Sequence, residues 1–210
     1  MTKHFLITAG PTREPIDPVR YITNRSSGKM GYALAGAAAH EGHRVTLISG
    51  PCDVDVPDGV DYLPVETAAD MYDAVQRYIK KADVAIFAAA VADYRPVSVP
   101  EQKIKKTGDT MTLELIKNPD ILGSARDIFG FEGTLIGFAA ETENVIDNAR
   151  GKLVKKKCDF VVANDVSRKD IGFDSNDNEV TLVYPDHTES LPLDDKYQLS
   201  IAIVKKAINL

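Results

Sequence analysis

The residue types best suited to chemistry are concentrated near the start of the chain, between an apolar segment and an alanine-rich one. Residues 4–9 have the composition of a strand, and residues 28–41 that of a helix followed by Gly42. A polar loop of about 17 residues joins them, whereas a dinucleotide-binding unit closes this gap with a short glycine-rich turn. The loop holds Arg13, Arg20, Arg25 and Asn24. Because a long loop within a compact domain is usually functional, we expect the site to be built around it.

The predicted helix begins with residues that suit an anion. Ser26 and Ser27 offer capping hydroxyls, Gly28 lets a ligand approach the backbone, and the helix dipole is positive at this end. We expect these three residues to bind a phosphate or a carboxylate; the alternative is that they only cap the helix. In the preceding loop, the Arg20 guanidinium suits a bidentate contact with such a group, and the Asn24 amide suits orientation of an acyl oxygen. The alternative there is a solvated loop of turn-forming residues.

A second group of candidates follows the apolar run 84–89, which we expect to be a central parallel strand. Open α/β sheets bind their ligands at the carboxyl ends of such strands. The small residues 88–92 leave room there for a base or a ribose, and Asp93 can accept from hydroxyls or hold a metal-bound phosphate. The alternative is that Asp93 only starts a turn.

Lysines form two further groups. Lys103, Lys105 and Lys106 fall in a predicted loop, where their ammonium groups suit a lid over a triphosphate and a departing pyrophosphate. Lys152 and the lysines at 155–157 fall in the last turns of a predicted helix, where cations also interact favourably with the helix dipole. For both groups the alternative is a solvated charged surface.

Strands and helices alternate along the chain. We expect strands at residues 4–9, 44–49, 60–64, 84–89, 134–139 and 160–163, and helices at 28–41, 68–81, 143–157 and 196–208. This alternation predicts an α/β fold with a doubly wound, mostly parallel, Rossmann-like sheet. A single domain of 210 residues is long enough to bury a substantial core.

Two segments break the alternation. Residues 110–116 alternate apolar and polar side chains, as expected of an edge strand, and residues 179–184 and 190–193 predict a β-hairpin. Because an isolated hairpin is marginally stable, we expect residues 167–193 to form an arm that docks on a second subunit, giving a C2 homodimer.

The composition excludes several classes of protein. A net charge of −6 argues against a surface that tracks nucleic-acid phosphates, and no apolar run approaches the length of a membrane span. The two cysteines have no metal-ligand or paired spacing. The N-terminal residues lead straight into a strand without a charged and apolar leader, so we expect a cytoplasmic enzyme with no membrane and no nucleic-acid partner.

An NAD-dependent oxidoreductase is disfavoured. A Rossmann site has an acidic residue at the end of its second strand, which binds the ribose hydroxyls. Here that strand ends at Ser49, Gly50 and Pro51 follow, and the first carboxylate is that of Asp53. The phosphate loop is also not GxGxxG. An NADP-binding oxidoreductase with a divergent site stays open, as does a regulatory module that binds a nucleotide without turnover.

Six strings taken together resemble one family. AGPTREPIDPVRYITNRSSGKMG, AAAVADYRP, KIKK, KNPDIL, GFAAET and ANDV occur in the order and spacing of phosphopantothenoylcysteine synthetase, the ligase of coenzyme A biosynthesis. The resemblance runs from Phe5 to the C-terminal helix. It implies that 4′-phosphopantothenate is joined to cysteine through an acyl-cytidylate. The reaction would consume CTP, require Mg²⁺, and release CMP and pyrophosphate.

The resemblance also assigns residues and partners. It places Asn24, Lys103 and Arg20 in catalysis, and it forms the nucleotide site from Phe87, Ala88, Ala89, Asp93, Lys103, Pro119, Asp120, Ile121, Leu122, Phe138, Lys152 and Lys156. It identifies no metal ligand, and it implies a homodimer. Met1 stands three residues before the first strand, so we expect a stand-alone synthetase with a separate decarboxylase acting on its product. VADYRP, KIKK and NPDIL favour CTP, while stand-alone eukaryotic members resemble ATP users.

Overall fold

The fold is built on an eight-stranded sheet, in a computed structural model that describes residues 1–106, 108–167 and 175–210. The strands are β1 (His4–Ala9), β4 (Arg44–Ser49), β5 (Val60–Pro64), β6 (Val84–Phe87), β9 (Thr134–Glu141), β10 (Phe160–Asp165), β11 (Asp177–Val183) and β12 (Thr188–Asp195). Their order is β12-β11-β10-β9-β6-β1-β4-β5, and all pairs from β10 to β5 are parallel. The chain reverses its direction of travel across the sheet between β1 and β6, which makes their carboxyl ends the topological switch point.

Helices cover both faces of the sheet, as the alternation predicts. On one face lie α1 (Lys29–His40) and α5 (Lys196–Ile208); on the other lie α2 (Ala68–Tyr78), its continuation η1 (Ile79–Lys81), α3 (Ile121–Asp127) and α4 (Val145–Lys156). Successive side chains of β1 alternate between the two cores, with Phe5 and Ile7 under α1 and Leu6 under α2. The predicted doubly wound α/β fold is therefore confirmed.

Helix α1 lies unusually close to the sheet because of its small residues. A Cβ on Gly31 would stand 2.4 Å from the Cβ of Ala9 on β1. This contact holds the start of α1 over the carboxyl end of β1, which is where the candidate site lies.

The predicted polar loop between β1 and α1 is wrong. Strands β2 (Arg13–Asp17) and β3 (Arg20–Thr23) pair there as an antiparallel hairpin. Asp17 makes the turn, since its carboxylate accepts from the N–H groups of Val19 at 2.9 Å and Arg20 at 3.0 Å. The hairpin is tied to the body by Glu14, whose buried carboxylate accepts from the Ala68 N–H at 2.9 Å.

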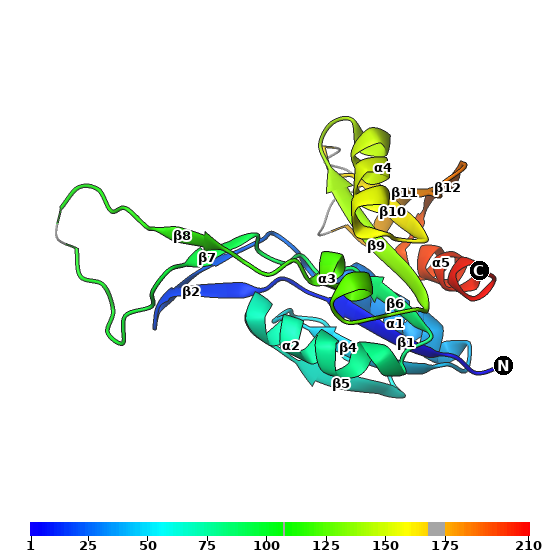
Figure 1. Ribbon diagram of the computed structural model, residues 1–210, viewed down its shortest axis with the longest axis horizontal. Helices are drawn as coiled ribbons and strands as arrows, with labels where there is room; N and C mark the ends of the chain where they lie inside the picture. Colours follow the sequence, from blue (N-terminus) through cyan, green and yellow to red (C-terminus); the bar gives the residue numbers. More distant parts are fainter. Residues whose placement is uncertain (107, 168–174) are drawn as a thin grey trace.

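The predicted edge strand 110–116 is also wrong for most of its length. Only Leu115–Lys117 forms a strand, β8, paired with β7 (Tyr94–Pro96) in a ribbon separate from the main sheet. Residues 110–114 extend past the end of β7 and are mostly exposed; the Glu114 carbonyl still accepts from the Val97 N–H at 3.0 Å, but the ladder does not continue beyond it within the described residues. Together with β2–β3, this pair forms a projecting ribbon (residues 13–23, 94–106 and 108–117) that extends from the body in Figure 1.

The predicted C-terminal hairpin is present but does not stand apart. Strands β11 and β12 pair with each other, and β11 also pairs antiparallel with β10, so the hairpin continues the main sheet. The argument that it needs a second subunit for stability therefore does not hold. Of the polar stretch before it, residues 168–174 lie outside the described residues.

Candidate functional site

Two adjoining hollows lie at the switch point. The first, of about 440 Å³, lies between the start of α1 and the segment after β6. The second, of about 330 Å³, lies between that segment, the start of α3 and the end of α4. Both are lined by Ala89, Val91, Asp93, Phe138 and Lys152. A ligand that fills both hollows must pass these five residues.

The first hollow contains the predicted anion-binding entrance of α1, with Ser26, Ser27 and Gly28 in its wall. Gly28 is the N-cap, with φ at 76°, and a Cβ there would stand 2.7 Å from the Cys52 sulfur. Glycine is therefore required. The expectation that a serine hydroxyl caps the helix is wrong: no side chain does so within the described residues, and the Ser26 hydroxyl instead accepts from the Gly28 N–H at 3.3 Å. The positive end of the helix dipole consequently meets the hollow without a capping side chain.

Asn24 lies in the same wall. Its Nδ2 donates to the carbonyl oxygens of Ala90 at 3.2 Å and Val91 at 3.0 Å, which holds the end of the hairpin against the segment after β6. The small side chains of that segment keep the hollow open beside the amide. Because both amide hydrogens face backbone carbonyls here, donation to an acyl oxygen requires one of these bonds to be released.

The predicted nucleotide residues gather around the second hollow. It is lined by Phe87, Ala89, Asp93, Pro119, Asp120, Ile121, Leu122, Phe138, Lys152 and Lys156, while Ala88 lines the first hollow. Strand β6 ends at Phe87, so Ala88 and Ala89 belong to the crevice rather than to the strand. The geometry thus brings together side chains from three separate strings of the sequence.

Charged groups in the second hollow are held by specific contacts. Asp120 is the N-cap of α3, accepts from the Gly123 N–H at 2.9 Å and pairs with Lys156 on α4. Burial by itself raises the pKa of Asp120, but the hydrogen bonds from Lys156 and Gly123 outweigh it and the pKa is lowered. The Lys152 ammonium donates to the Phe138 carbonyl at 2.8 Å, and burial lowers its pKa. An incoming polyphosphate would favour the charged form of Lys152 and so oppose the effect of burial.

Several lining residues were missed by the sequence analysis. Asn164, Asn178 and Lys196 line the first hollow, and Lys117, Asn118 and Lys155 line the second. Asn164 carries a buried Oδ1 without a hydrogen-bond partner among the described residues, in a wall where a ligand donor would satisfy it. The ANDV string held the signal, because Asn164 is one of the last two residues of a strand, β10, at the carboxyl end where ligands bind.

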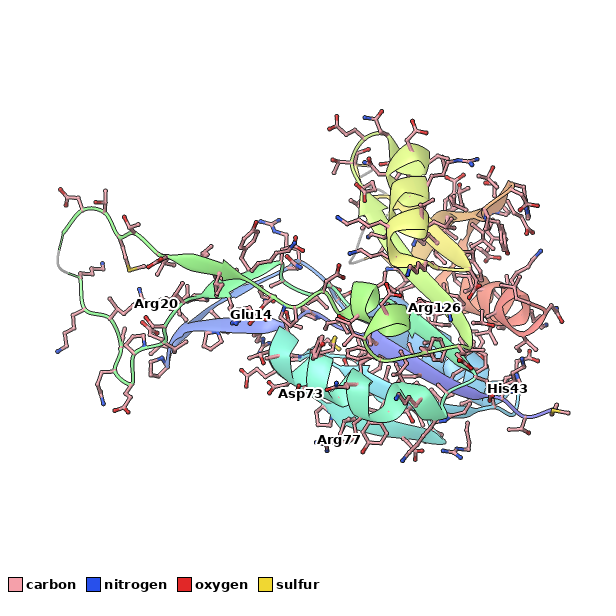
Figure 2. All side chains as sticks on the ribbon, in the orientation of Figure 1. Glu14, Arg20, His43, Asp73, Arg77 and Arg126 are labelled. Atoms are coloured by element: carbon pink, nitrogen blue, oxygen red, sulfur yellow. The ribbon has the colours of Figure 1, made fainter. Side chains whose placement is uncertain are left out.

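Arg20 and Lys103 are not brought to these hollows by their own chain. Arg20 lines a separate hollow on the projecting ribbon with Ile104, Lys105 and Lys106, and Lys103 lines none of the hollows found in the described part of the chain. Figure 2 shows Arg20 out on the ribbon, well away from Arg126 on α3. The predicted catalytic residues therefore fall into two groups, one in the body and one on the ribbon.

Comparison with known proteins decides the family. The family model described as DNA/pantothenate metabolism flavoprotein C-terminal domain matches residues 1–210. The chain belongs to this family. Among members of the flavoprotein C-terminal domain family, the crystal structure of the C-terminal domain of the coenzyme A biosynthesis bifunctional protein CoaBC is 42% identical, with a TM-score of 0.82, and the match covers 97% of this chain and 93% of that one.

Curated relatives of this flavoprotein C-terminal domain are longer. The coenzyme A biosynthesis bifunctional protein CoaBC of Vibrio parahaemolyticus is 52% identical over 97% of this chain and 52% of its own length. That of Escherichia coli is 44% identical over 98% of this chain and 51% of its own length. The chain thus spans about half the length of the curated relatives it matches. Within the described ranges, no helix is both long and apolar enough to span a membrane.

Proposed function

We propose that this domain is a phosphopantothenate–cysteine ligase that uses CTP. A carboxylate oxygen of 4′-phosphopantothenate attacks the α-phosphorus of CTP, and the bond to the β-phosphate breaks to release pyrophosphate. The cysteine amine then attacks the acyl carbon, loses its proton, and displaces CMP. The observation that carries the proposal is the pair of adjoining hollows that meet at Asp93 and Lys152.

Each hollow suits one substrate. The first has a helix entrance for a phosphate, an amide at Asn24 and a wall of small residues, as an extended phosphorylated acid requires. The second has aromatic and aliphatic side chains for a base and the Lys152 and Lys156 ammonium groups for phosphates. The acyl carboxylate and the α-phosphate then meet where the hollows join. Concentrated positive charge is needed there because the two substrates would otherwise repel.

Magnesium fits as an ion carried by the triphosphate rather than by a protein cage. Among the described residues no group of three or more His, Cys, Asp or Glu side chains could hold a metal. Mg²⁺ commonly binds substrate phosphates plus one or two carboxylates, and Asp93, in the wall shared by both hollows, is the carboxylate placed for that role. The ion would neutralise phosphate charge.

We further propose that the protein is a homodimer in which the ribbon of one subunit completes the site of the other. Arg20 and Lys103 belong to the ribbon segments, and neither residue lines the two hollows of the body. Large apolar side chains are exposed along the ribbon: Val19, Tyr21, Tyr94, Val97, Val99, Met111, Leu115 and Ile116. Exposed apolar side chains in such number are typical of an interaction surface. This replaces the hairpin as the proposed contact.

One assay tests the proposed activity. Protein, phosphopantothenate, cysteine and Mg²⁺ are mixed with CTP or ATP, and pyrophosphate is measured. We expect release with CTP that exceeds release with ATP. Release with ATP alone would overturn the nucleotide assignment. Tight NADPH binding without pyrophosphate would favour an oxidoreductase, and nucleotide binding without turnover would favour a regulatory module.

A further inference from the structure

Asp17 is the last residue of β2, where the chain turns into β3, and its carboxylate is fully buried. One oxygen, Oδ1, accepts from the Val19 and Arg20 backbone N–H groups and shapes the β2–β3 turn. The other, Oδ2, accepts from the Arg20 Nε at 3.0 Å, from the Arg20 Nη2, and from the backbone N–H of Ile104 at 3.1 Å. The turn itself needs only the first oxygen, so the contacts of the second one call for a separate explanation.

Those contacts reach a segment that is distant in sequence. Ile104 lies 87 residues from Asp17, within the KIKK segment (residues 103–106). Arg20 adds a second link, because its Nη2 also donates to the Ile104 carbonyl at 3.1 Å. Both backbone groups of Ile104 are therefore held by one ion pair. Its chain neighbours Lys103 and Lys105 are exposed.

The ion pair is strong enough to act as an anchor. The Arg20 guanidinium, assisted by the backbone N–H donors, holds the pKa of Asp17 well below its usual range against the opposing effect of burial. The carboxylate stays ionised throughout the neutral range. Two guanidinium nitrogens, Nε and Nη2, donate to the same oxygen, Oδ2, and such charge-assisted hydrogen bonds are stronger than neutral ones.

We propose that Asp17 is a positioning residue that anchors the KIKK segment to the β2–β3 hairpin and thereby places Lys103 for phosphate neutralisation. The expected effect on catalysis rests on the proposed ligase function, whereas the anchoring of residues 103–106 does not depend on it. Among the described residues, the hydrogen bonds of Ile104 to Asp17 and Arg20 are the only ones that hold the backbone of residues 103–106. Asp17 touches no substrate in this scheme and acts through Ile104.

The test is a double-mutant cycle between Asp17→Asn and Lys103→Gln, read as the rate of pyrophosphate release. We expect Asp17→Asn to lower kcat by about tenfold or more in the wild-type background, since a displaced catalytic group commonly costs one to two orders of magnitude. In the Lys103→Gln background the same change should lower kcat by a clearly smaller factor, because Lys103 is already gone and the remaining loss comes only from Arg20, the other partner of Asp17. Equal losses in both backgrounds would overturn the proposal, as would full activity in Asp17→Asn. Glu114→Gln, which changes an exposed carboxylate on the same ribbon outside the hollow around Arg20, is the matched control and should retain wild-type activity.

Hydrogen exchange separates the anchor from the proposed activity. Asp17→Asn should speed amide exchange in the peptide containing Ile104, while exchange in β1 and β6 stays unchanged. If wild-type protein released no pyrophosphate, the ligase assignment would fall, and this measurement would still decide whether the anchor exists. If Asp17→Asn fails to fold, Ile104→Pro is the second variant. It removes the backbone N–H that donates to Asp17 and leaves the Asp17–Arg20 pair in place. Unchanged exchange around residue 104 in the folded variant would refute the anchor.

Discussion

Asn24 offers a test of how the two half-reactions divide at the scale of a residue. In Asn24→Asp a carboxylate replaces the amide, faces the Ala90 and Val91 carbonyls, and repels an acyl oxygen on which negative charge develops. Losing such a donor commonly slows a step by about 10²–10³. We expect the variant to release pyrophosphate for one turnover and to accumulate the acyl-cytidylate, as measured by rapid quench with labelled CTP. If no intermediate forms, Asn24 acts in activation or only in holding the hairpin.

Lys103 carries the complementary prediction for the first half-reaction. The side chain is exposed, so Lys103→Gln should change the free energy of unfolding by less than about 0.5 kcal/mol. It should slow acyl-cytidylate formation much more, because the lost charge is one that neutralises a triphosphate. Lys80→Gln removes another exposed lysine, on η1, and serves as the control. Full activity in Lys103→Gln would show that this lysine is only a solvent-exposed surface residue with no part in the reaction.

Sequence reasoning predicted some of these residues because their positions follow a general rule. Ala89 and Asp93 were found because ligands bind where a central parallel strand ends, and the second hollow is built there, whereas Phe87 was predicted only from the family resemblance. Asn178 and Lys196 were missed, since they come from β11 and the start of α5, which reach the first hollow only through the order of strands in the sheet. Spacing along the chain carries no signal for such contacts.

At the scale of the element, α1 illustrates a helix whose packing overrides its intrinsic helix propensity. Gly31→Ala would favour the helix locally, but the new methyl would meet Ala9 on β1 at 2.4 Å. We expect a net loss of about 1–3 kcal/mol in the free energy of unfolding, because an overpacked core must shift. The matched variant is Gly151→Ala on α4, where an added Cβ meets nothing within 4 Å. That change should stabilise by about 0.5–1 kcal/mol. Chemical denaturation measures both, and a neutral Gly31→Ala would contradict the close contact between α1 and β1.

The elements predicted wrongly share a cause. Residues 13–23 are polar and contain Pro15 and Pro18, which favours a loop locally, yet they pair as β2–β3 because Asp17 closes the turn and Glu14 fastens the hairpin to α2. Residues 110–116 have the alternation of a strand, but only the part that faces β7 finds a partner. Strand formation depends on neighbours distant in sequence, whereas the helices were predicted well because their periodicity is local.

At the scale of the whole molecule, the order of strands in the sheet determines where the two hollows lie, and the ribbon separates Arg20 and Lys103 from the other predicted site residues. The switch point between β1 and β6 gathers three strings of the sequence around two hollows. The ribbon extends from the body in Figure 1 and carries Arg20 in Figure 2, and neither Arg20 nor Lys103 lines those two hollows. Alternation predicted the sheet and a site after the strand at residues 84–89, and the family resemblance added the residues of the other strings. Neither predicted the ribbon, because its shape also depends on contacts between segments distant in sequence, such as that between Asp17 and Ile104.

The proposed dimer makes the last prediction, which concerns sites shared between subunits. Light scattering at micromolar concentration should give the mass of a dimer, and a monomer would contradict it.

If Arg20 serves the partner's hollow, then Asn24→Asp and Arg20→Gln, each impaired by itself, should complement each other when co-expressed. In a mixed dimer one hollow then has an intact Asn24 together with an intact Arg20 from the other subunit. Random pairing makes half of the dimers mixed, so activity should return to about one quarter of the wild-type value in an isologous dimer. If Arg20 instead served its own chain, every hollow in the mixed dimer would carry one substitution, and the mixture would be no more active than the average of its two parents.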